Sequence, residues 1–242
     1  SQIIKSLLKR KGTAVTRGST FENQENLAAA ALEQLREKYE GTRLGRQELY
    51  AEVLDDIEGA LWNYRLIEKA KIEEKETPEM QRVVVAIDPA VTGNENSDET
   101  GIIVAGRGVD EKFYVLDDRS LRGSPDTWAQ AAVSAFSEWK ADRIVAEVNN
   151  GGDLVEKVIR TIDRSVPYTP VRASRGKILR AEPIAALYEQ GKVSHCGVFR
   201  ELEDQMTSYT PQSKKSPDRL DALVWALTEL NRSTGQPVWR IS

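Results

Sequence analysis

The stretch Arg82-Val83-Val84-Val85-Ala86-Ile87-Asp88-Pro89 decides how this chain folds. Five apolar residues run without interruption before Asp88, which is typical of a strand covered on both faces in an α/β sheet. The strand then ends on a carboxylate, and the proline after it cannot extend a central strand. An acid at a strand end often forms an ordinary turn. A functional role for Asp88 therefore depends on whether other residues of the chain belong to the same site.

Downstream of this strand, the sequence predicts two further strands and then alternating helices and strands. The next two strands are expected at 101–106 and 112–117, with a turn between them. The later elements are expected as helices at 124–140, 151–164, 176–189 and 216–230, with strands at 143–147 and 168–171. Three strands in a meander followed by alternating elements predict an α/β fold with a mixed sheet flanked by helices.

Upstream of residue 80 the composition is different. Residues 1–80 are rich in Glu, Lys, Leu and Ala, with helical periodicity at 25–40 and 47–72 and two glycines between these stretches. The charged stretch 69–80 is interpreted as a linker. The sequence thus predicts a mainly helical segment at 1–80 and an α/β domain at 81–242.

The bulk composition narrows the class of protein. The chain has 242 residues, 40% of them hydrophobic and 30% charged, which is enough for one sizeable core with an appendage. A single cysteine, Cys196, excludes an internal disulfide and fits a reducing compartment. Apolar runs stay far below the ~18 residues that a membrane span needs, and no signal-peptide pattern is present, so no membrane partner is expected.

Two further acids stand where acids are costly. Glu147 ends an apolar strand, and an unpaired buried carboxylate is strongly unfavourable. Asp221 lies a turn inside the last expected helix, too deep to cap it. Asp218 lies in the first turn, where an acid can simply complement the helix dipole. The stretch Ser124-Pro125-Asp126 repeats the Ser-Pro-Asp pattern of 216–218 at another expected helix start. Asp126 has no catalytic context there, so Asp218 alone is weak evidence for a site.

Together these acids indicate a metal site. The order strand, strand, helix for Asp88, Glu147 and Asp221 is typical of a ribonuclease-H-like nuclease. Carboxylate oxygens select hard ions such as Mg²⁺ or Mn²⁺, and two such ions can clamp the attacking and leaving oxygens of a phosphodiester. The expected catalytic residues are Asp88, Glu147 and Asp221, and the expected metal ligands are Asp88, Glu147, Asp218 and Asp221.

The net charge is −4, so any affinity for nucleic acid must come from local basic clusters. The acid-free stretch 172–180 and a pair shortly before Asp221 supply two such clusters. The candidate DNA-binding residues are Arg172, Arg175, Lys177, Arg180, Lys214 and Lys215. The one histidine, His195, is interpreted as structural rather than catalytic.

Four stretches of the chain resemble one known family as a set. They are Val85-Ala86-Ile87-Asp88-Pro89-Ala90, then 146–153, then 180–191, and finally Pro217-Asp218-Arg219-Leu220-Asp221-Ala222 with the residues up to 227. They resemble the large subunit of the DNA-packaging terminase of tailed bacteriophages or gene transfer agents. The resemblance implies that Asp88, Glu147 and Asp221 are the metal-binding acids of its nuclease domain. The Asp-x-x-Asp pair also resembles junction resolvases, which keeps Asp218 among the ligands.

Residues 13–63 resemble the end of the terminase ATPase domain and its linker. The chain has no G-x-x-x-x-G-K-[ST] phosphate loop, so it is not expected to hydrolyse ATP. The resemblance implies an endonuclease that uses two Mg²⁺ or Mn²⁺ ions to cut double-stranded DNA concatemers with low sequence specificity. It also implies the terminase ATPase domain, the small terminase subunit and the portal as partners. The implied location is the host cytoplasm, transiently at the procapsid portal.

Three alternatives remain open at this point. A junction-resolving endonuclease of the same superfamily would use similar acids, but it leaves residues 1–80 unexplained. A non-catalytic packaging-motor or docking module would carry the acids as structural groups. An actin-like ATPase needs two glycine-rich phosphate loops, and residues 88–93 make a poor first one.

Overall fold

The computed structural model describes residues 57, 59–89, 99–148, 152–173, 176–213 and 216–232. The chain divides into two compact units, Ser1–Asp55 and Asp56–Ser242, and all described residues belong to the second. The helix expected at 25–40 therefore lies outside the described residues. In the described part of the chain, no helix is long and apolar enough to cross a membrane.

The described strands form one six-stranded mixed sheet in the order β5-β4-β1-β2-β3-β6. The bounds of its strands are β1 Met80–Asp88, β2 Gly101–Gly108, β3 Phe113–Asp118, β4 Arg143–Glu147, β5 Tyr168–Val171 and β6 Val193–His195. The pairs β1–β2 and β2–β3 are antiparallel, while β4 and β5 run parallel to β1. This confirms the predicted meander followed by parallel strands.

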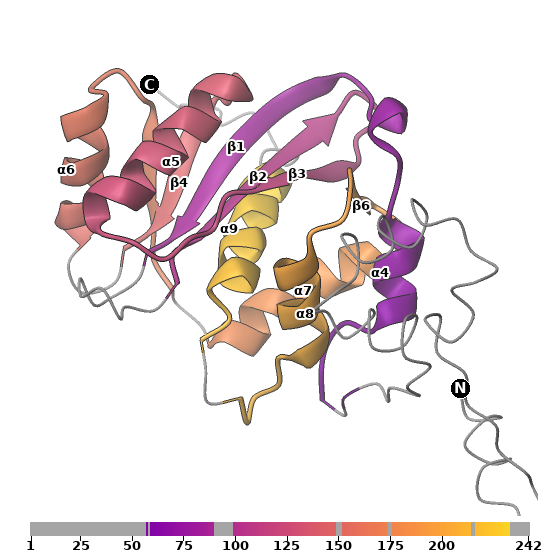
Figure 1. Cartoon of the computed structure of the whole chain (residues 1–242). Helices are drawn as coiled ribbons and strands as arrows, with labels where there is room; N and C mark the ends of the chain where they lie inside the picture. The colour runs from indigo at the N-terminus through magenta and orange to yellow at the C-terminus, as the bar shows by residue number, and fades with distance from the viewer. Residues whose placement is uncertain are drawn as a thin grey trace, which may run out of the picture. The chain divides into compact units, whose positions relative to one another are not determined.

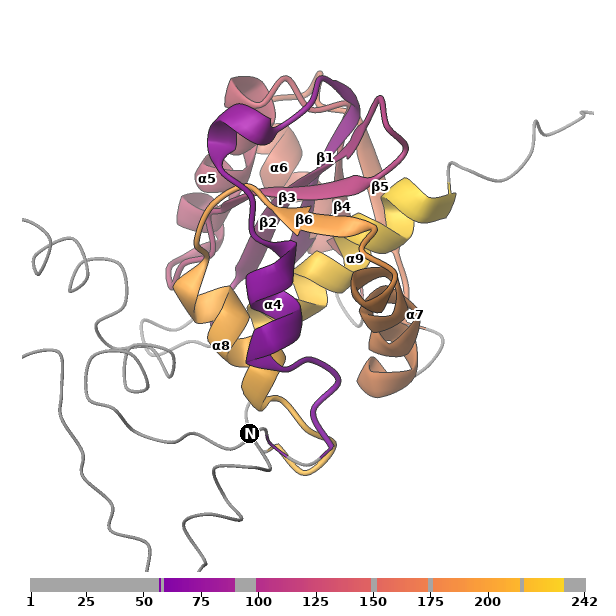
Figure 2. The same cartoon turned by 90° about the vertical axis from the view of Figure 1, so that its right-hand side faces the viewer.

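Helices cover both faces of the sheet (Figures 1 and 2). The helices α5 Pro125–Glu138 and α6 Gly152–Ile162 lie on one face. The other face carries α4 Tyr64–Ala70, α7 Lys177–Glu189, α8 Arg200–Ser208 and α9 Asp218–Arg232. Each face has its own core, and β1 supplies both: Val84 and Ala86 point toward α9, whereas Val85 and Ile87 point toward α5. Burial on both faces explains why this strand is an unbroken apolar run.

In its described part, the helix expected at 47–72 is confirmed at Tyr64–Ala70 and wrong before that. Gly59 adopts φ of 87°, a left-handed conformation that favours glycine, and residues 60–63 are not helical. A new helix, α4, begins after Asn63, whose side chain accepts a hydrogen bond of 2.9 Å from the backbone N–H of Leu66. The break turns Trp62 and Ile67 into the core beside α7 and α9.

The stretch interpreted as a linker also packs on the sheet. Lys71 forms an isolated bridge with His195 of β6, and a short 3-10 helix spans Glu74–Glu76. Residues of 59–80 therefore share a core with the sheet and belong to the same compact unit, Asp56–Ser242. The origin of residues 1–80 in an ATPase domain stays a prediction.

Sequence reasoning also left out β6 and α8, both between α7 and α9. The strand β6 has only three residues, too few to show an alternating pattern. The helix α8 is strongly polar, and its two apolar residues, Leu202 and Met206, are too few to predict a helix from the sequence. Of the two, α8 bears on the site, because Gln205 of α8 contacts the first turn of α9.

Candidate metal centre

The register of the sheet brings Asp88 and Glu147 together. Strands β1 and β4 are parallel neighbours, paired up to Ile87 and Ala146, so Asp88 and Glu147 are the next residues at the same edge. On β4, Val145 points to the face covered by α9. Since side chains alternate along a strand, Glu147 points to that face as well, and so does Asp88 two residues after Ala86. Both carboxylates thus face α9.

The first turn of α9 supplies the two remaining acids. Asp218 is the first residue of α9 and is 7% exposed, and Asp221, one turn later, is 4% exposed. The helix starts later than expected: the N–H of Asp221 donates to the carbonyl of Pro217 over 2.8 Å, which makes Pro217 the residue before the helix. Ser216, the first residue of the helix expected at 216–230, lies outside it, and its hydroxyl accepts from Lys177 of α7 over 2.8 Å.

Two cations from α7 enter this group of acids. Lys177 forms a hydrogen-bonded ion pair with Asp221. Arg180 reaches Glu147 over 3.2 Å and Asp221 over 3.6 Å. Both cations come from the acid-free stretch interpreted as a DNA-binding segment. We call Asp88, Glu147, Asp218 and Asp221 the acid cluster, and Lys177 and Arg180 are its counter-ions.

Trp225 also holds the acid cluster in place. Its indole N–H donates to Oε2 of Glu147 over 2.6 Å, and its ring lies under the guanidinium of Arg180 with the Cζ atom 4.6 Å from the ring centre. The side chain of Trp225 is almost fully buried, one turn beyond Asp221. One carboxylate oxygen of Glu147 is thus fixed by two donors, which sets the direction of the other.

The acids raise one another's pKa values. Burial of the carboxyl group, with the charges of Asp221 and Glu147, raises the pKa of Asp88 well above its usual value. Burial also raises the pKa of Asp221, although Lys177 and Arg180 oppose that rise. Burial lowers the pKa of Lys177, but Asp221 and Asp88 outweigh it and the net shift is upward. At Asp88, repulsion from the neighbouring acids therefore outweighs the attraction of Lys177.

The donor set of the acid cluster fits hard divalent ions. Its donors are carboxylate oxygens, the ligands that Mg²⁺ and Mn²⁺ prefer. Burial and the neighbouring acids raise the pKa of Asp88, and divalent ions bound to these carboxylates would relieve the same repulsion. Within the described residues, no three Asp, Glu, His or Cys side chains are already arranged as a metal cage. The ion pairs of Lys177 and Arg180 account for this, because they hold Asp221 and Glu147 toward cations of the protein.

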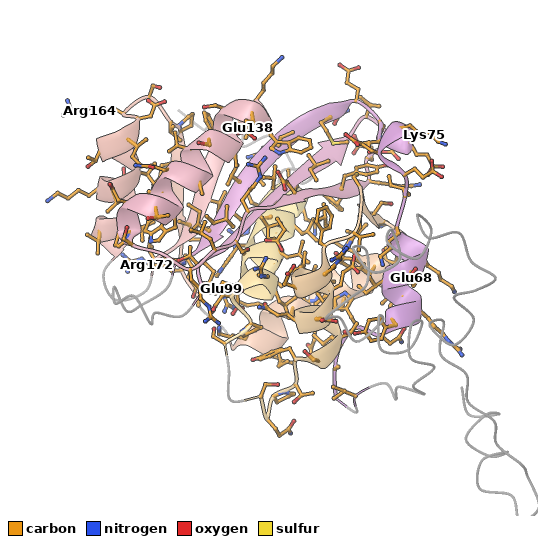
Figure 3. All side chains as sticks on the ribbon, in the orientation of Figure 1. Glu68, Lys75, Glu99, Glu138, Arg164 and Arg172 are labelled. Atoms are coloured by element: carbon orange, nitrogen blue, oxygen red, sulfur yellow. The ribbon has the colours of Figure 1, made fainter. Side chains whose placement is uncertain are left out.

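The other predicted residues divide into three groups. Arg172 is exposed and follows Val171 of β5, which pairs with Glu147, so it lies at the same edge of the sheet as the acid cluster (Figure 3). Arg175, Lys214 and Lys215 lie outside the described residues. His195 is fully buried, with hydrogen bonds of 2.8 Å to the Tyr188 hydroxyl and 3.4 Å to Glu203, which supports its structural interpretation.

Sequence reasoning missed two contributors to the site. The sequence assigns no role to Trp225, and no local pattern shows that its indole reaches a residue on β4. Gln205 lies on a helix that was not predicted at all. In both cases the contact joins elements far apart in the chain, and only the assembled fold brings them together.

The family model described as "Terminase RNaseH-like domain" matches residues 85–230, more than half of the chain. The chain belongs to this family. The match contains all four members of the acid cluster and both counter-ions. A search of the curated proteins gives no match.

Several solved terminase structures share this fold. The nuclease domain of the P22 large terminase is 16% identical with a TM-score of 0.55, covering 73% of this chain and 95% of its own. The nuclease domain of gp2 of bacterial virus Sf6 is 14% identical with a TM-score of 0.53, covering 69% and 98%. The large terminase of a thermophilic bacteriophage is 12% identical with a TM-score of 0.51. The match covers 87% of this chain and 54% of that longer one. At these identities the likeness establishes the ribonuclease-H-like fold of a terminase nuclease domain.

Proposed function

We propose that this chain is a metal-dependent endonuclease that cuts double-stranded DNA concatemers during viral genome packaging. The observation that carries the proposal is the acid cluster: two strand ends and one helix turn bring four acids together, and Asp221, Glu147 and Asp218 all act on the charge of Asp88. Folded proteins rarely keep such an arrangement without a ligand, because burying like charges together is costly. The family membership and the all-oxygen donor set favour divalent ions as that ligand.

Each residue of the cluster has a distinct part in this proposal. Asp88 lies between the β4 and α9 acids and would contact both of two Mg²⁺ or Mn²⁺ ions, with Glu147 holding one and Asp221, with Asp218, the other. Ions bound there would supply an activated water and stabilise the charge on the phosphate, so no side-chain general base is needed. The solved structures of a variant Sf6 gp2 nuclease domain with manganese and with calcium support a divalent ion at this fold.

The counter-ions would change partners when ions and DNA bind. Lys177 is the more exposed of the two, with 38% of its side chain accessible against 11% for Arg180. Divalent ions on the carboxylates would release Lys177 to a DNA phosphate. Arg180 would stay stacked on Trp225 and keep Glu147 in place. Exposed Arg172 and the basic residues 175, 214 and 215 would add phosphate contacts, which carry little sequence information.

The wider setting of the proposal comes from the family. We propose that the DNA is delivered by a terminase ATPase domain, with the small terminase subunit and portal as further partners, at the procapsid in the host cytoplasm. The large terminase of the thermophilic bacteriophage has been solved with ATP-γ-S, and the present chain spans about half of that protein. This chain has no ATP-binding phosphate loop, so cutting should not require ATP.

A plasmid-nicking assay tests the proposal, paired with direct Mn²⁺ titration by calorimetry. The wild-type chain should bind Mn²⁺ and nick supercoiled DNA with Mn²⁺ or Mg²⁺, without ATP, and EDTA should stop it. Asp221→Asn should lose both properties. Glu229→Gln is the matched control, because Glu229 is a buried acid at the far end of α9 that pairs with Arg82 over 2.8 Å. A wild-type chain that binds no Mn²⁺ and cuts no DNA would favour a non-catalytic packaging module.

A further inference from the structure

The first turn of α9 receives its cap from another helix. Oε1 of Gln205, on α8, accepts hydrogen bonds from the backbone N–H groups of Arg219 over 3.0 Å and of Leu220 over 3.2 Å. These are the second and third residues of α9, whose N–H groups have no acceptor within the helix. The preceding residue, Pro217, has no side-chain oxygen to fill this role. Gln205 therefore satisfies donors that the α9 sequence leaves open.

The same turn is fixed by the side chain of Arg219. Its Nε and Nη2 atoms each donate to Glu99 over 2.8 Å, and its Nη1 donates to Asp118 at the end of β3 over 2.7 Å. The amide of Gln205 also donates to Glu99, over 3.4 Å. Hydrogen bonds between charged groups are the stronger kind. Gln205, Arg219 and Glu99 thus form one connected network around the start of α9.

Close packing against β2 leaves this turn little room. A Cβ atom at Gly101 would lie 2.0 Å from the carbonyl oxygen of Asp218, so only glycine allows the approach. Gly101 pairs with Asp88 across the β1–β2 ladder. The backbone of Asp218 therefore rests on the residue opposite Asp88, and a small shift of this turn changes the distance between the α9 acids and β1.

We propose that Gln205 is a positioning residue for the metal centre: its hydrogen bonds to Arg219 and Leu220 hold Asp218 and Asp221 facing Asp88 and Glu147. The inference rests on the proposed function, since it takes the acid cluster to be the metal site. Arg219 and Leu220 lie between the two aspartates in sequence, so the capped N–H groups belong to the same turn as the ligands. The cap also opposes the repulsion among like charges, which pushes that turn away from β1.

The variant Gln205→Met tests this inference, because Met keeps the length of the side chain and removes its hydrogen bonds. Amide hydrogen exchange at Arg219 and Leu220 should accelerate by about tenfold, the effect of losing hydrogen bonds worth about 1.4 kcal/mol together. The Mn²⁺ dissociation constant, measured by calorimetry, should rise by up to about tenfold, with melting of the whole domain little changed. Gln205→Glu keeps the oxygen acceptor but loses the donor to Glu99 and sets two carboxylates together, so it should restore only part of both properties.

The control is Asp204→Asn, one residue earlier on α8. Asp204 accepts a 2.9 Å hydrogen bond from Tyr64 of α4 and takes no part in the hydrogen bonds between Gln205 and α9. It should leave exchange in α9 and Mn²⁺ affinity as in the wild type. Faster exchange in Gln205→Met with unchanged Mn²⁺ affinity would overturn the positioning role, and so would no change in either. A wild-type chain without Mn²⁺ binding would instead overturn the proposed function, and the positioning role with it.

Discussion

Two buried polar clusters in this domain are built in opposite ways. The histidine cluster joins Lys71, the residue after α4, to Tyr188, His195 and Glu203 of α7, β6 and α8. Its buried carboxylate, Glu203, meets Lys71 over 3.0 Å and His195 over 3.4 Å, and Lys71 also pairs with the more exposed Glu68. The acid cluster instead places acids against one another, with Lys177 and Arg180 as the counter-ions described above. An acid paired with cations serves the fold, whereas acids held against acids store repulsion that a proton or a cationic ligand relieves.

The pKa shifts follow the same division. Burial raises the pKa of Glu203, but the hydrogen bond with His195 and the charge of Lys71 outweigh it, so the net pKa lies below its usual value. The pKa of Asp88 lies well above its usual value, because burial and the neighbouring acids act in the same direction. The cost of burying a carboxylate is thus compensated by cations at Glu203, whereas at Asp88 the neighbouring acids add to it.

The largest contrast is expected in DNA cutting. Asp88→Asn should lower the Mn²⁺-dependent nicking rate by at least about a hundredfold, since loss of even an indirect metal contact costs about 10–100-fold. Glu203→Gln should keep a rate close to that of the wild type, because the histidine cluster has no proposed contact with metal or DNA. Initial rates on supercoiled plasmid, at a temperature where both variants are folded, measure this. A Glu203→Gln variant that folds but cannot cut would remove the distinction between the clusters.

In stability, Glu203→Gln should be the more damaging of the two variants, and Asp88→Asn the less damaging. In EDTA, Glu203→Gln should lower the free energy of unfolding by about 1–3 kcal/mol, because it removes the buried charged partner of His195 and leaves Lys71 with only the more exposed Glu68. Asp88→Asn should leave that free energy unchanged or raise it, since it removes one of the repelling carboxylates. Denaturant unfolding of both proteins checks this. A strongly destabilised Asp88→Asn would show that the acid cluster supports the fold.

A pH series in EDTA sharpens the comparison further. For Asp88, the folded pKa lies above the unfolded value of 3.8, so the folded state binds the extra proton between these two values. Its contribution to stability is present at low pH and is lost as the pH rises through the folded pKa. For Glu203, the folded pKa lies below 4.5, so its contribution is full above 4.5 and is lost as the pH falls through the folded pKa.

Subtracting the unfolding curve of Asp88→Asn from that of the wild type isolates the first effect. Over the range from about pH 4 up to the folded pKa of Asp88, the variant should gain stability relative to the wild type as the pH rises. A difference that stays flat across this range would mean that Asp88 titrates as an ordinary exposed carboxylate. For Glu203→Gln, the deficit in unfolding free energy relative to the wild type should shrink as the pH falls through the folded pKa of Glu203.

The sequence predicted the sheet well because its evidence is local. The strands that end at Asp88 and Glu147 each appear in the sequence as an apolar run. The start of α5 is equally local, since the side chain of Ser124 accepts from the N–H of Thr127. The start of α9 was misplaced because its cap comes from Gln205, far away in sequence but adjacent in space. Likewise, no pattern within 172–180 shows that Lys177 and Arg180 turn toward acids while Arg172 remains exposed.

That last difference gives the smallest expected effect. Arg172 is exposed beside the acid cluster, whereas Arg180 is already paired with Glu147 and stacked on Trp225. A phosphate contact from Arg172 releases counter-ions from DNA, so Arg172→Ala should make the slope of log K against log salt shallower by about 0.9. Arg180→Ala should lower cutting instead and leave the slope nearly unchanged, because its charge is already neutralised within the protein. Fluorescence anisotropy with duplex DNA in Ca²⁺ at several salt concentrations measures both slopes. Equal slope changes in the two variants would place Arg180 on the DNA path, and the acid cluster would then lack one of its fixed counter-ions when DNA binds.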